Sequence, residues 1–466
     1  MNGLFKKLNE SKVFNDLNPQ EFAWVLYDVG NSAYTMLACS LIPIWFKNLA
    51  TMFTVKQEEA MIADQGLSAA VGEVYVRELA NAQGLLSQNQ ATSYYATALS
   101  IVTIIIALLG PVCGTIADRK DTRKIFFTTT VAAGVAGCIL NSFAPTWIMF
   151  LVVYVLAKVM YQASLTFYDS MLNDVTTDER ADAVSSYGYA WGYIGSCIPF
   201  IVALGAYVCG PDMLGLISET LSKIIGFTVT GAWWMIVSLP LIKNYKQINF
   251  VEEKKSIGQT FAQLFNTLKK IATKDKKVLL FLIAFFMYID GVGTIIDHCI
   301  NLGTALGLDT VGSVVFLLLT QVVAWGGSLV FAKLSKKYDT VPLILVCITG
   351  YFVVCLYALT LKQLWQFAIM AFGVGCFQGS IQSLSRSYYS KIIPDENSGE
   401  YFGIYDIFSK GASFLGSVVI SVITGIPGGN INLAVASLAI FFAFGFVFLK
   451  LADKQPQSEE SLKDIQ

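Results

Sequence analysis

The chain has 466 residues, of which 55% are hydrophobic and 14% are charged, and its mean hydropathy is +0.58. Soluble globular domains carry about 25% charged residues, so this composition excludes an ordinary soluble protein. It indicates a membrane protein whose partner is the lipid bilayer. The formal net charge of -1 provides no basic field for nucleic acid, so we expect no nucleic-acid partner. The single histidine and nine scattered cysteines predict no metal site, no disulfide framework and no cofactor.

Apolar windows of about 20 residues, long enough to cross a bilayer core of about 30 Å, recur along almost the whole chain. We predict an all-α membrane protein with twelve transmembrane helices. The N-terminal residues lack the features of a signal peptide, so the first span is expected to be retained. The predicted spans are 22–46, 93–117, 125–143, 146–168, 184–208, 226–242, 278–302, 310–333, 342–361, 363–388, 402–424 and 432–450.

The positions of lysine and arginine set the predicted orientation. Most of the 32 basic residues fall in segments on the same side as the N-terminus, which places both termini in the cytoplasm. Two insertions interrupt the spans: residues 47–92 on the outer side, with a helical pattern, and the lysine-rich residues 243–277 on the inner side. Two interpretations of the second insertion are open, an amphipathic helix on an anionic lipid surface and a solvated connector.

The two halves of the chain resemble repeats of one another. The stretch GPVCGTIADRKDTRK after the second span has a weaker counterpart in GSLVFAKLSKKYDT after the eighth. Two six-helix halves joined by a long loop are the architecture of a secondary transporter with a midplane site. The predicted domains are an N-terminal bundle 1–242 that contains the insertion 47–92, a cytoplasmic basic linker 243–277, a C-terminal bundle 278–450 and a cytoplasmic tail 451–466.

The loop GTIADRKDTRK places Gly114, Asp118, Arg119 and Arg123 at the cytoplasmic end of the second span. It matches the G-x-x-x-D-R-x-x-x-R signature of the major facilitator superfamily. A glycine permits close helix approach, and Asp118 can accept hydrogen bonds at the N-terminus of a neighbouring helix. We predict a latch that holds one gate state; the competing interpretation is a loop that is basic only because it lies inside.

Polar stripes mark several spans. Asp28, Asn31, Ser32 and Thr35 share one face of the first span at i, i+3, i+4 and i+7. Charge at the bilayer centre costs at least about 2.5 kcal/mol, so such stripes face water, a cavity or a charge partner. The candidates for a substrate or proton cavity are Asp28, Asn31, Ser32, Lys158, Gln162, Asp290, Thr294, Asp297, Gln378 and Gln382, and the gating or structural candidates are Gly114, Asp118, Arg119, Arg123, Arg386, Asp406 and Lys410.

Each buried charge has two interpretations. In one, it lines a hydrated cavity between the halves, where Lys158 is the counter-charge for Asp28 or for a substrate carboxylate. In the other, it has a structural role, either as a contact between helices or as an ion pair within one helix, and the second is favoured for Asp406 with Lys410 at i, i+4. Carboxylates in cavities often exchange protons near neutral pH, so protons are the candidate coupling ion.

Longer stretches resemble one branch of the superfamily, the bacterial relatives of the autophagy-related vacuolar amino-acid effluxers. The resemblance rests on WVLYDVGNSAY, YYATALSIVTIIIALLGPVCGTIADRKDTRK, YDSMLNDV with AWGYIGS, YIDGVGTI and QGSIQSLSRSYYSKIIPDENSGEYFGIYDIFSKGASFLG. The family pattern implies functional positions at Asp28, Asn31, Ser32, Asp290, Gly291, Gln378, Gln382, Ser385, Arg386, Phe402, Gly403 and Lys410. The chain departs from the pattern at Asp169-Ser170, Ile289 and Asp297, which implies a more acidic cavity.

These patterns predict a transporter and not an enzyme, because no nucleophile with a base stands out. We expect a monomer in the cytoplasmic membrane of a bacterium that moves a small polar solute by alternating access. The resemblance implies an amino acid as that solute. Two alternatives remain: an exporter of amphipathic compounds, and a non-transporting membrane sensor or scaffold.

Overall fold

The computed structural model describes residues 16–53, 55–65, 69–211, 213–252, 257–305, 310–410, 414–425 and 430–456. These residues are almost entirely helical. The helices are α2 (Pro19–Cys39), α3 (Leu41–Ala50), α4 (Val55–Asp64), α5 (Ala69–Ala82), α6 (Gln88–Ala117), α7 (Thr122–Asn141), α8 (Trp147–Ser170), α9 (Leu172–Val175), α10 (Asp178–Val208), α11 (Glu219–Asn244), α12 (Ile257–Thr273), α13 (Lys276–Ala305), α14 (Thr310–Leu334), α15 (Thr340–Tyr357), η1 (Ala358–Thr360), α16 (Leu364–Ile392), α17 (Ser398–Lys410), α18 (Phe414–Gly425), α19 (Ile431–Ser437) and α20 (Ala439–Asp453).

The predicted spans coincide with helices or helix pairs. Within the described residues, eleven helical segments are long and apolar enough to cross a membrane. The predicted span 402–424 corresponds to α17 and α18, and residues 411–413 between them lie outside the described part. The all-α membrane fold is confirmed, whereas the total of twelve spans and the orientation of the termini stay predictions.

The start of α2 is fixed by local capping. The Asn18 side chain accepts hydrogen bonds from the backbone N–H groups of Gln20 and Glu21 at 2.9 Å, and the Glu21 carboxylate accepts from the Asn18 N–H at 2.8 Å. This capping box, with Pro19 in the first turn, specifies where the helix begins. Glu21 also pairs with Arg180 of α10 at 2.8 Å, which ties together two helices of the central site.

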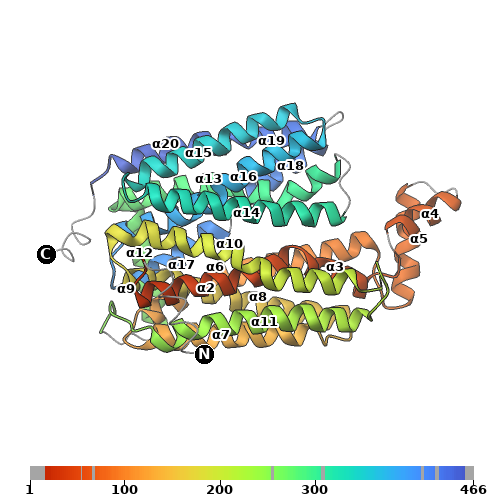
Figure 1. The fold of residues 1–466 in the computed structure, drawn as a ribbon, viewed down its shortest axis with the longest axis horizontal. Helices are drawn as coiled ribbons and strands as arrows, with labels where there is room; N and C mark the ends of the chain where they lie inside the picture. The colour runs from red at the N-terminus through yellow and green to blue at the C-terminus, as the bar shows by residue number, and fades with distance from the viewer. Residues whose placement is uncertain are drawn as a thin grey trace.

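The helices form two stacked groups, each around its own apolar core (Figure 1). We call α2 to α11 the N half and α13 to α20 the C half. The halves meet where α6 contacts α17 and where α10 contacts α14 and α16. A space between two packed halves is therefore the natural place for a central site. The exact domain boundaries stay a prediction.

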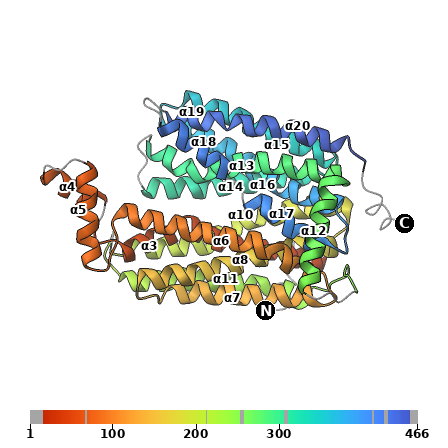
Figure 2. The same cartoon turned by 180° about the vertical axis from the view of Figure 1, so that it is seen from behind.

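The two ends of the bundle differ (Figure 2). Helices α4 and α5 of the predicted insertion stand out from one end, which we call the insertion end. Helix α12 of the linker crosses the other end, which we call the linker end, and Gln263 on α12 donates to Glu400 of α17 at 2.6 Å. Phe265 on α12 is 70% exposed. The helical interpretation of both insertions thus agrees with the structure, and binding of α12 to lipid stays a prediction.

Glycines bring α6 and α17 into backbone contact near the linker end. A Cβ atom on Gly114 would overlap the carbonyl oxygen of Gly399. One helical turn away in the same contact, a Cβ on Gly403 would come within 2.5 Å of Pro111 Cα. Small residues permit this close approach, which larger side chains would prevent.

We predict that Gly114→Ala separates α6 from α17. Overpacking of a closed interface costs about 1–3 kcal/mol, so the thermal unfolding temperature of the purified protein should fall by several degrees. The matched control is Gly205→Ala on α10, where a Cβ would meet no atom within 4 Å. Equal unfolding temperatures for the two variants would contradict the packing account.

Candidate functional site

A central cavity of about 460 Å³ lies between the two halves. Helices α2, α6, α8 and α10 line it from the N half, and α13, α14, α16 and α17 line it from the C half. Of the candidate site and gating residues, those in the lining are Asp28, Asn31, Ser32, Lys158, Gln162, Gln378, Gln382, Arg386 and Asp406. Tyr161, Asp169, Tyr189 and Tyr193 add further polar groups. The cavity is therefore polar and carries charges of both signs.

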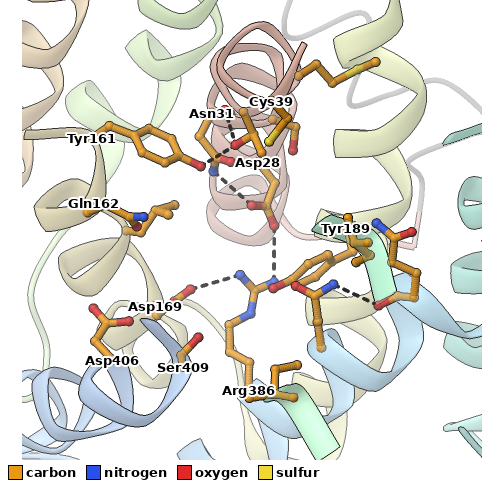
Figure 3. Close-up of a pocket in the computed structure, with 18 of the residues that line it drawn as sticks. Asp28, Asn31, Cys39, Tyr161, Gln162, Asp169, Tyr189, Arg386, Asp406 and Ser409 are labelled. Carbon is orange, nitrogen blue, oxygen red and sulfur yellow. Dashed lines mark hydrogen bonds and ion pairs between the residues drawn. The ribbon is translucent and has the colours of Figure 1, made fainter. Parts of the chain in front are cut away.

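Arg386 reaches from α16 of the C half into the N half at the floor of this cavity (Figure 3). Its Nη2 atom lies 3.2 Å from Oδ2 of Asp28, and its Nη1 atom lies 3.0 Å from Oδ1 of Asp169. The Nε atom donates to the Ser185 hydroxyl at 3.0 Å. Asn31 donates to the other Asp28 oxygen at 3.0 Å. One guanidinium thus joins α2, α8 and α10 to the C half.

Aromatic rings enclose the same guanidinium. The Arg386 Cζ atom lies 4.5 Å from the ring centroid of Trp24 and 4.7 Å from that of Tyr189. Planar guanidinium groups stack on aromatic faces and bind carboxylates in a fixed geometry, which an ammonium cannot reproduce. The position therefore requires arginine and not just a positive charge.

A glycine on α10 makes room for this ion pair. A Cβ atom on Gly188 would overlap Oδ2 of Asp28 and lie 3.3 Å from Nη2 of Arg386. A Cβ on Gly192, one turn further along, would come within 2.8 Å of the Ser32 hydroxyl. The glycines of this stretch thus allow α10 to pass directly against the polar stripe of α2.

Lys158 lies on the wall of the cavity, and its ammonium faces tyrosines. The Nζ atom is 5.2 Å from the ring centroid of Tyr161 and 5.7 Å from that of Tyr34. Lys158 was expected as a counter-charge for Asp28, but the ion pair of Asp28 is with Arg386. The difference arises because Arg386 comes from the other half, and proximity across the halves leaves no trace in local spacing.

Asp290 and Thr294, which the sequence placed in the cavity, lie between α13 and α18 instead. The Asp290 carboxylate accepts hydrogen bonds from the backbone N–H groups of Leu415 at 3.1 Å and Gly416 at 2.7 Å. Thr294 donates to the same carboxylate at 3.4 Å. Asp290 therefore stabilises the first turn of α18, where the helix dipole favours an anion.

A second cavity of about 390 Å³ adjoins the first on the side of the insertion end. It contains Asp297, and most of its lining is apolar, including Leu99, Phe316 and Phe367. The residues that line both cavities are Cys39, Lys158, Ile296, Leu317, Gln321 and Gln378. A path of decreasing polarity thus leads from the central cavity toward the insertion end.

The signature loop forms a contact between the halves at the linker end, which we call the Asp118 lock. Asp118 accepts hydrogen bonds from the backbone N–H groups of Gly399 at 2.7 Å and Glu400 at 2.8 Å, at the start of α17. Arg123 pairs with Asp118 at 2.5 Å and with Asp174 at 2.7 Å. The helix dipole and the guanidinium both stabilise the carboxylate in this position.

Burial raises the pKa of Asp118 to about 6, against the opposing effects of Arg123 and of the two N–H groups of α17. The groups that donate to Asp118 are a guanidinium and two backbone N–H groups, all of which favour the ionised carboxylate, so the Asp118 lock is a charged contact.

The remaining gating candidates have varied surroundings. Arg119 is half-buried in the loop after α6. Asp406 lines the cavity and accepts a hydrogen bond from Thr166 of the N half. Lys410 ends α17, and its side chain lies outside the described residues, so its pairing with Asp406 stays a prediction.

Sequence analysis missed two acidic residues that join separate segments. Asp174 accepts from Arg123 and from the N–H groups of Ile248 and Asn249, which begin the linker. Asp182 on α10 pairs with Lys391 of the C half at 2.8 Å. Both acids lie near helix starts, a position that acids favour generally, so the sequence carried no specific signal for either.

Two helical halves around a central cavity are also the fold of solved transporters of the major facilitator superfamily. The crystal structure of the transporter FucP in the outward conformation has a TM-score of 0.65 at 14% identity and covers 94% of this chain and 98% of that chain. The proton:xylose symporter XylE has a TM-score of 0.65 at 10% identity and covers 96% and 97%.

Sequence comparison defines the family more closely. The sequence model of the family described as vacuole effluxer Atg22 like matches residues 19–461, and the chain belongs to that family. The uncharacterized MFS-type transporter YxiO of Bacillus subtilis is 34% identical over 446 residues, which is 95% of this chain and 96% of that protein. Autophagy-related protein 22 of Eremothecium gossypii is 26% identical over 339 residues, 67% of this chain and 62% of that protein. The resemblance inferred from sequence motifs is thereby confirmed.

We predict that Arg386→Met strongly lowers thermal stability, because it leaves Asp28 and Asp169 as buried carboxylates without their partner. Removing one member of a buried ion pair costs about 3–5 kcal/mol. The triple variant Arg386→Met with Asp28→Asn and Asp169→Asn removes the stranded charges as well. It should regain much of the lost unfolding temperature, and a triple variant no more stable than Arg386→Met would refute the account.

Proposed function

We propose that the protein is a secondary active transporter that moves a small polar solute, with an amino acid as the first candidate, across the cell membrane by alternating access. The observation that carries the proposal is the central cavity, which both halves line with charged and amide side chains. A site at the junction of two halves can be exposed to either side when the halves rock against each other.

The charges of the cavity support a zwitterionic solute. Lys158 offers a cation for a carboxylate, and Asp28 and Asp406 offer anions for an ammonium group. Gln378 and Gln382 also line the cavity, and their amide groups provide neutral hydrogen-bond donors and acceptors. An α-amino acid carries an ammonium group and a carboxylate, so it can pair with cavity groups of both signs at once.

Protons are the proposed coupling ion. Arg386 is shared by Asp28 and Asp169, so a proton on either carboxylate removes one of its two ion pairs. That loss weakens the contact between the halves at the floor of the cavity. Protonation and separation of the halves are linked in this way, which is the requirement for coupling a proton to a conformational change.

The proposed orientation follows the distribution of basic residues. The linker end, with α12 and the signature loop, faces the cytoplasm, and the insertion end faces outward. The contacts of Asp118 and Arg386 close the linker end, while the second cavity extends toward the insertion end. With this orientation, a closed linker end is expected in the state whose solute site is accessible from outside.

The apolar lining of the second cavity favours one other candidate, export of amphipathic compounds. An amphipathic solute would place its apolar part against Phe316 and Phe367 and its charged group beside Lys158 or Asp297. Both proposed functions use alternating access, and they differ only in the solute that is moved.

We predict uptake of amino acids by proteoliposomes that contain the purified protein, tested with a labelled amino-acid pool with and without an imposed pH gradient. Asp28→Asn and Lys158→Met should each lower the initial rate by about tenfold or more, equivalent to about 1.4 kcal/mol or more. Asp28→Asn should also weaken the dependence on the gradient, because Asp169 remains as the one carboxylate paired with Arg386.

The control variant is Glu78→Gln, an exposed acid on α5 that is remote from the cavity. It should transport at the wild-type rate. If the protein shows a cooperative unfolding transition, and is therefore folded, but moves no amino acid in either direction, amino acids are rejected as the solute. A positive result with amphipathic dyes in the same vesicles would then support the second candidate.

A further inference from the structure

Asp182 on α10 is a second acidic hub between the halves, outside the signature loop. It is 4% exposed. The Oδ1 atom accepts a hydrogen bond from the Ser387 hydroxyl at 2.6 Å, and the Oδ2 atom accepts from the Thr340 hydroxyl at 2.6 Å. Lys391 pairs with Oδ2 at 2.8 Å and also donates to Thr340 at 3.1 Å. One carboxylate of the N half thus holds two helices of the C half, α15 and α16.

The next turn of α10 continues this contact toward the cavity. Ser185 donates to the backbone carbonyl of Ser383 at 2.7 Å, and the Ser186 hydroxyl lies 3.1 Å from the Ser383 hydroxyl. Arg386 then follows on α16 with its bonds to Ser185 and Asp28. Polar contacts therefore run without interruption from Asp182 at the linker end to the floor of the central cavity.

The Asp182 contacts and the Asp118 lock lie at different helix–helix interfaces between the two halves, each of which we call a seam. Asp118 joins α6 to backbone N–H groups of α17. Asp182 joins α10 to side chains on α15 and α16. The two backbone donors to Asp118 and the three side-chain donors to Asp182 belong to the opposite half, so neither carboxylate can keep these contacts when the halves separate at the linker end.

We propose that Asp182, with Thr340, Ser387 and Lys391, forms a second lock, so that the linker end opens only when this lock and the Asp118 lock are both released. The inference rests on the proposed alternation between two states. Hydrogen bonds to charged groups contribute about 1.5–3 kcal/mol, so loss of Asp182 shifts the balance of states toward the open linker end by about tenfold or more. Asp182 acts on transport as a positioning residue that is remote from the solute.

The test measures access from each end without any solute. Cys39 is exposed and lines both cavities, so it reports access from the insertion end. In a variant that retains Cys39 as its one cysteine, Asp182→Asn should slow labelling by a membrane-impermeant maleimide, by less than about tenfold because the population of the favoured state changes less than the equilibrium constant. In a second cysteine-free background with Ser383→Cys, which is buried at the seam, the same substitution should accelerate labelling.

Opposite changes at the two reporters separate a shift of state from loss of structure, because unfolding would accelerate labelling at both. Both labelling rates are also measured in the Asp118→Ala background, where the Asp118 lock is absent. There, Asp182→Asn should change each rate further in the same direction as Asp118→Ala does. The matched control is Glu179→Gln, an exposed acid one turn earlier on α10, which should change neither rate.

Unchanged labelling at both reporters in both backgrounds would overturn the second lock. Accelerated labelling at both reporters would assign Asp182 a purely structural role and would overturn it as well. If the opposite shifts are found but no solute is transported by proteoliposomes, the lock stands and the proposed cargo fails. The two failures are therefore distinguishable.

Discussion

The contact on which the rest of the structure depends is a single guanidinium from the C half buried among acids and rings of the N half. Arg386 is 3% exposed and has two carboxylates within 3.2 Å. Buried ion pairs of this kind add little net stability compared with apolar packing, because both charges must be desolvated, and one of their best-attested uses is to specify a particular arrangement. In this protein the specified arrangement is the closed position of the two halves at the floor of the cavity.

The organisation of the cavities follows from that closure. The Arg386 contacts, the Asp118 lock and the Asp182 contacts all lie between the central cavity and the linker end, on the seams formed by α6 with α17 and by α10 with α15 and α16. On the other side of the central cavity, the adjoining cavity is mostly apolar. In the proposed alternation, polar contacts between the halves are exchanged for water when the interface opens, which keeps the free-energy difference between the two states small.

Much of the fold and part of the site could be predicted from the sequence. The spans were visible because apolar windows repeat, and the stripe of Asp28, Asn31 and Ser32 was visible because residues at i, i+3 and i+4 share a helix face. The partner of Asp28 was not visible, since Arg386 is 358 residues away in the chain. The sequence suggested Lys158 because it is the basic residue on another cavity-facing stripe of the same half.

Asp290 illustrates a second limit of the sequence. Its helical face resembles that of Asp28, and the family pattern also implies a functional position there, so both favour the cavity for Asp290. The structure shows it bound to N–H groups at the start of α18, and that helix start falls inside a predicted continuous span. Periodic patterns indicate which face of a helix is polar, but they do not distinguish a water-filled neighbour from the exposed backbone of another helix.

The most direct test of alternation is a pair of distances measured by spin-label spectroscopy on the purified protein in lipid. One label pair spans the linker end, at Lys120 and Tyr338, and the other spans the insertion end, at Leu216 and Trp365, all at exposed positions. The account predicts that Arg386→Met lengthens the first distance and shortens the second. Two unchanged distances, or two that lengthen together, would contradict it.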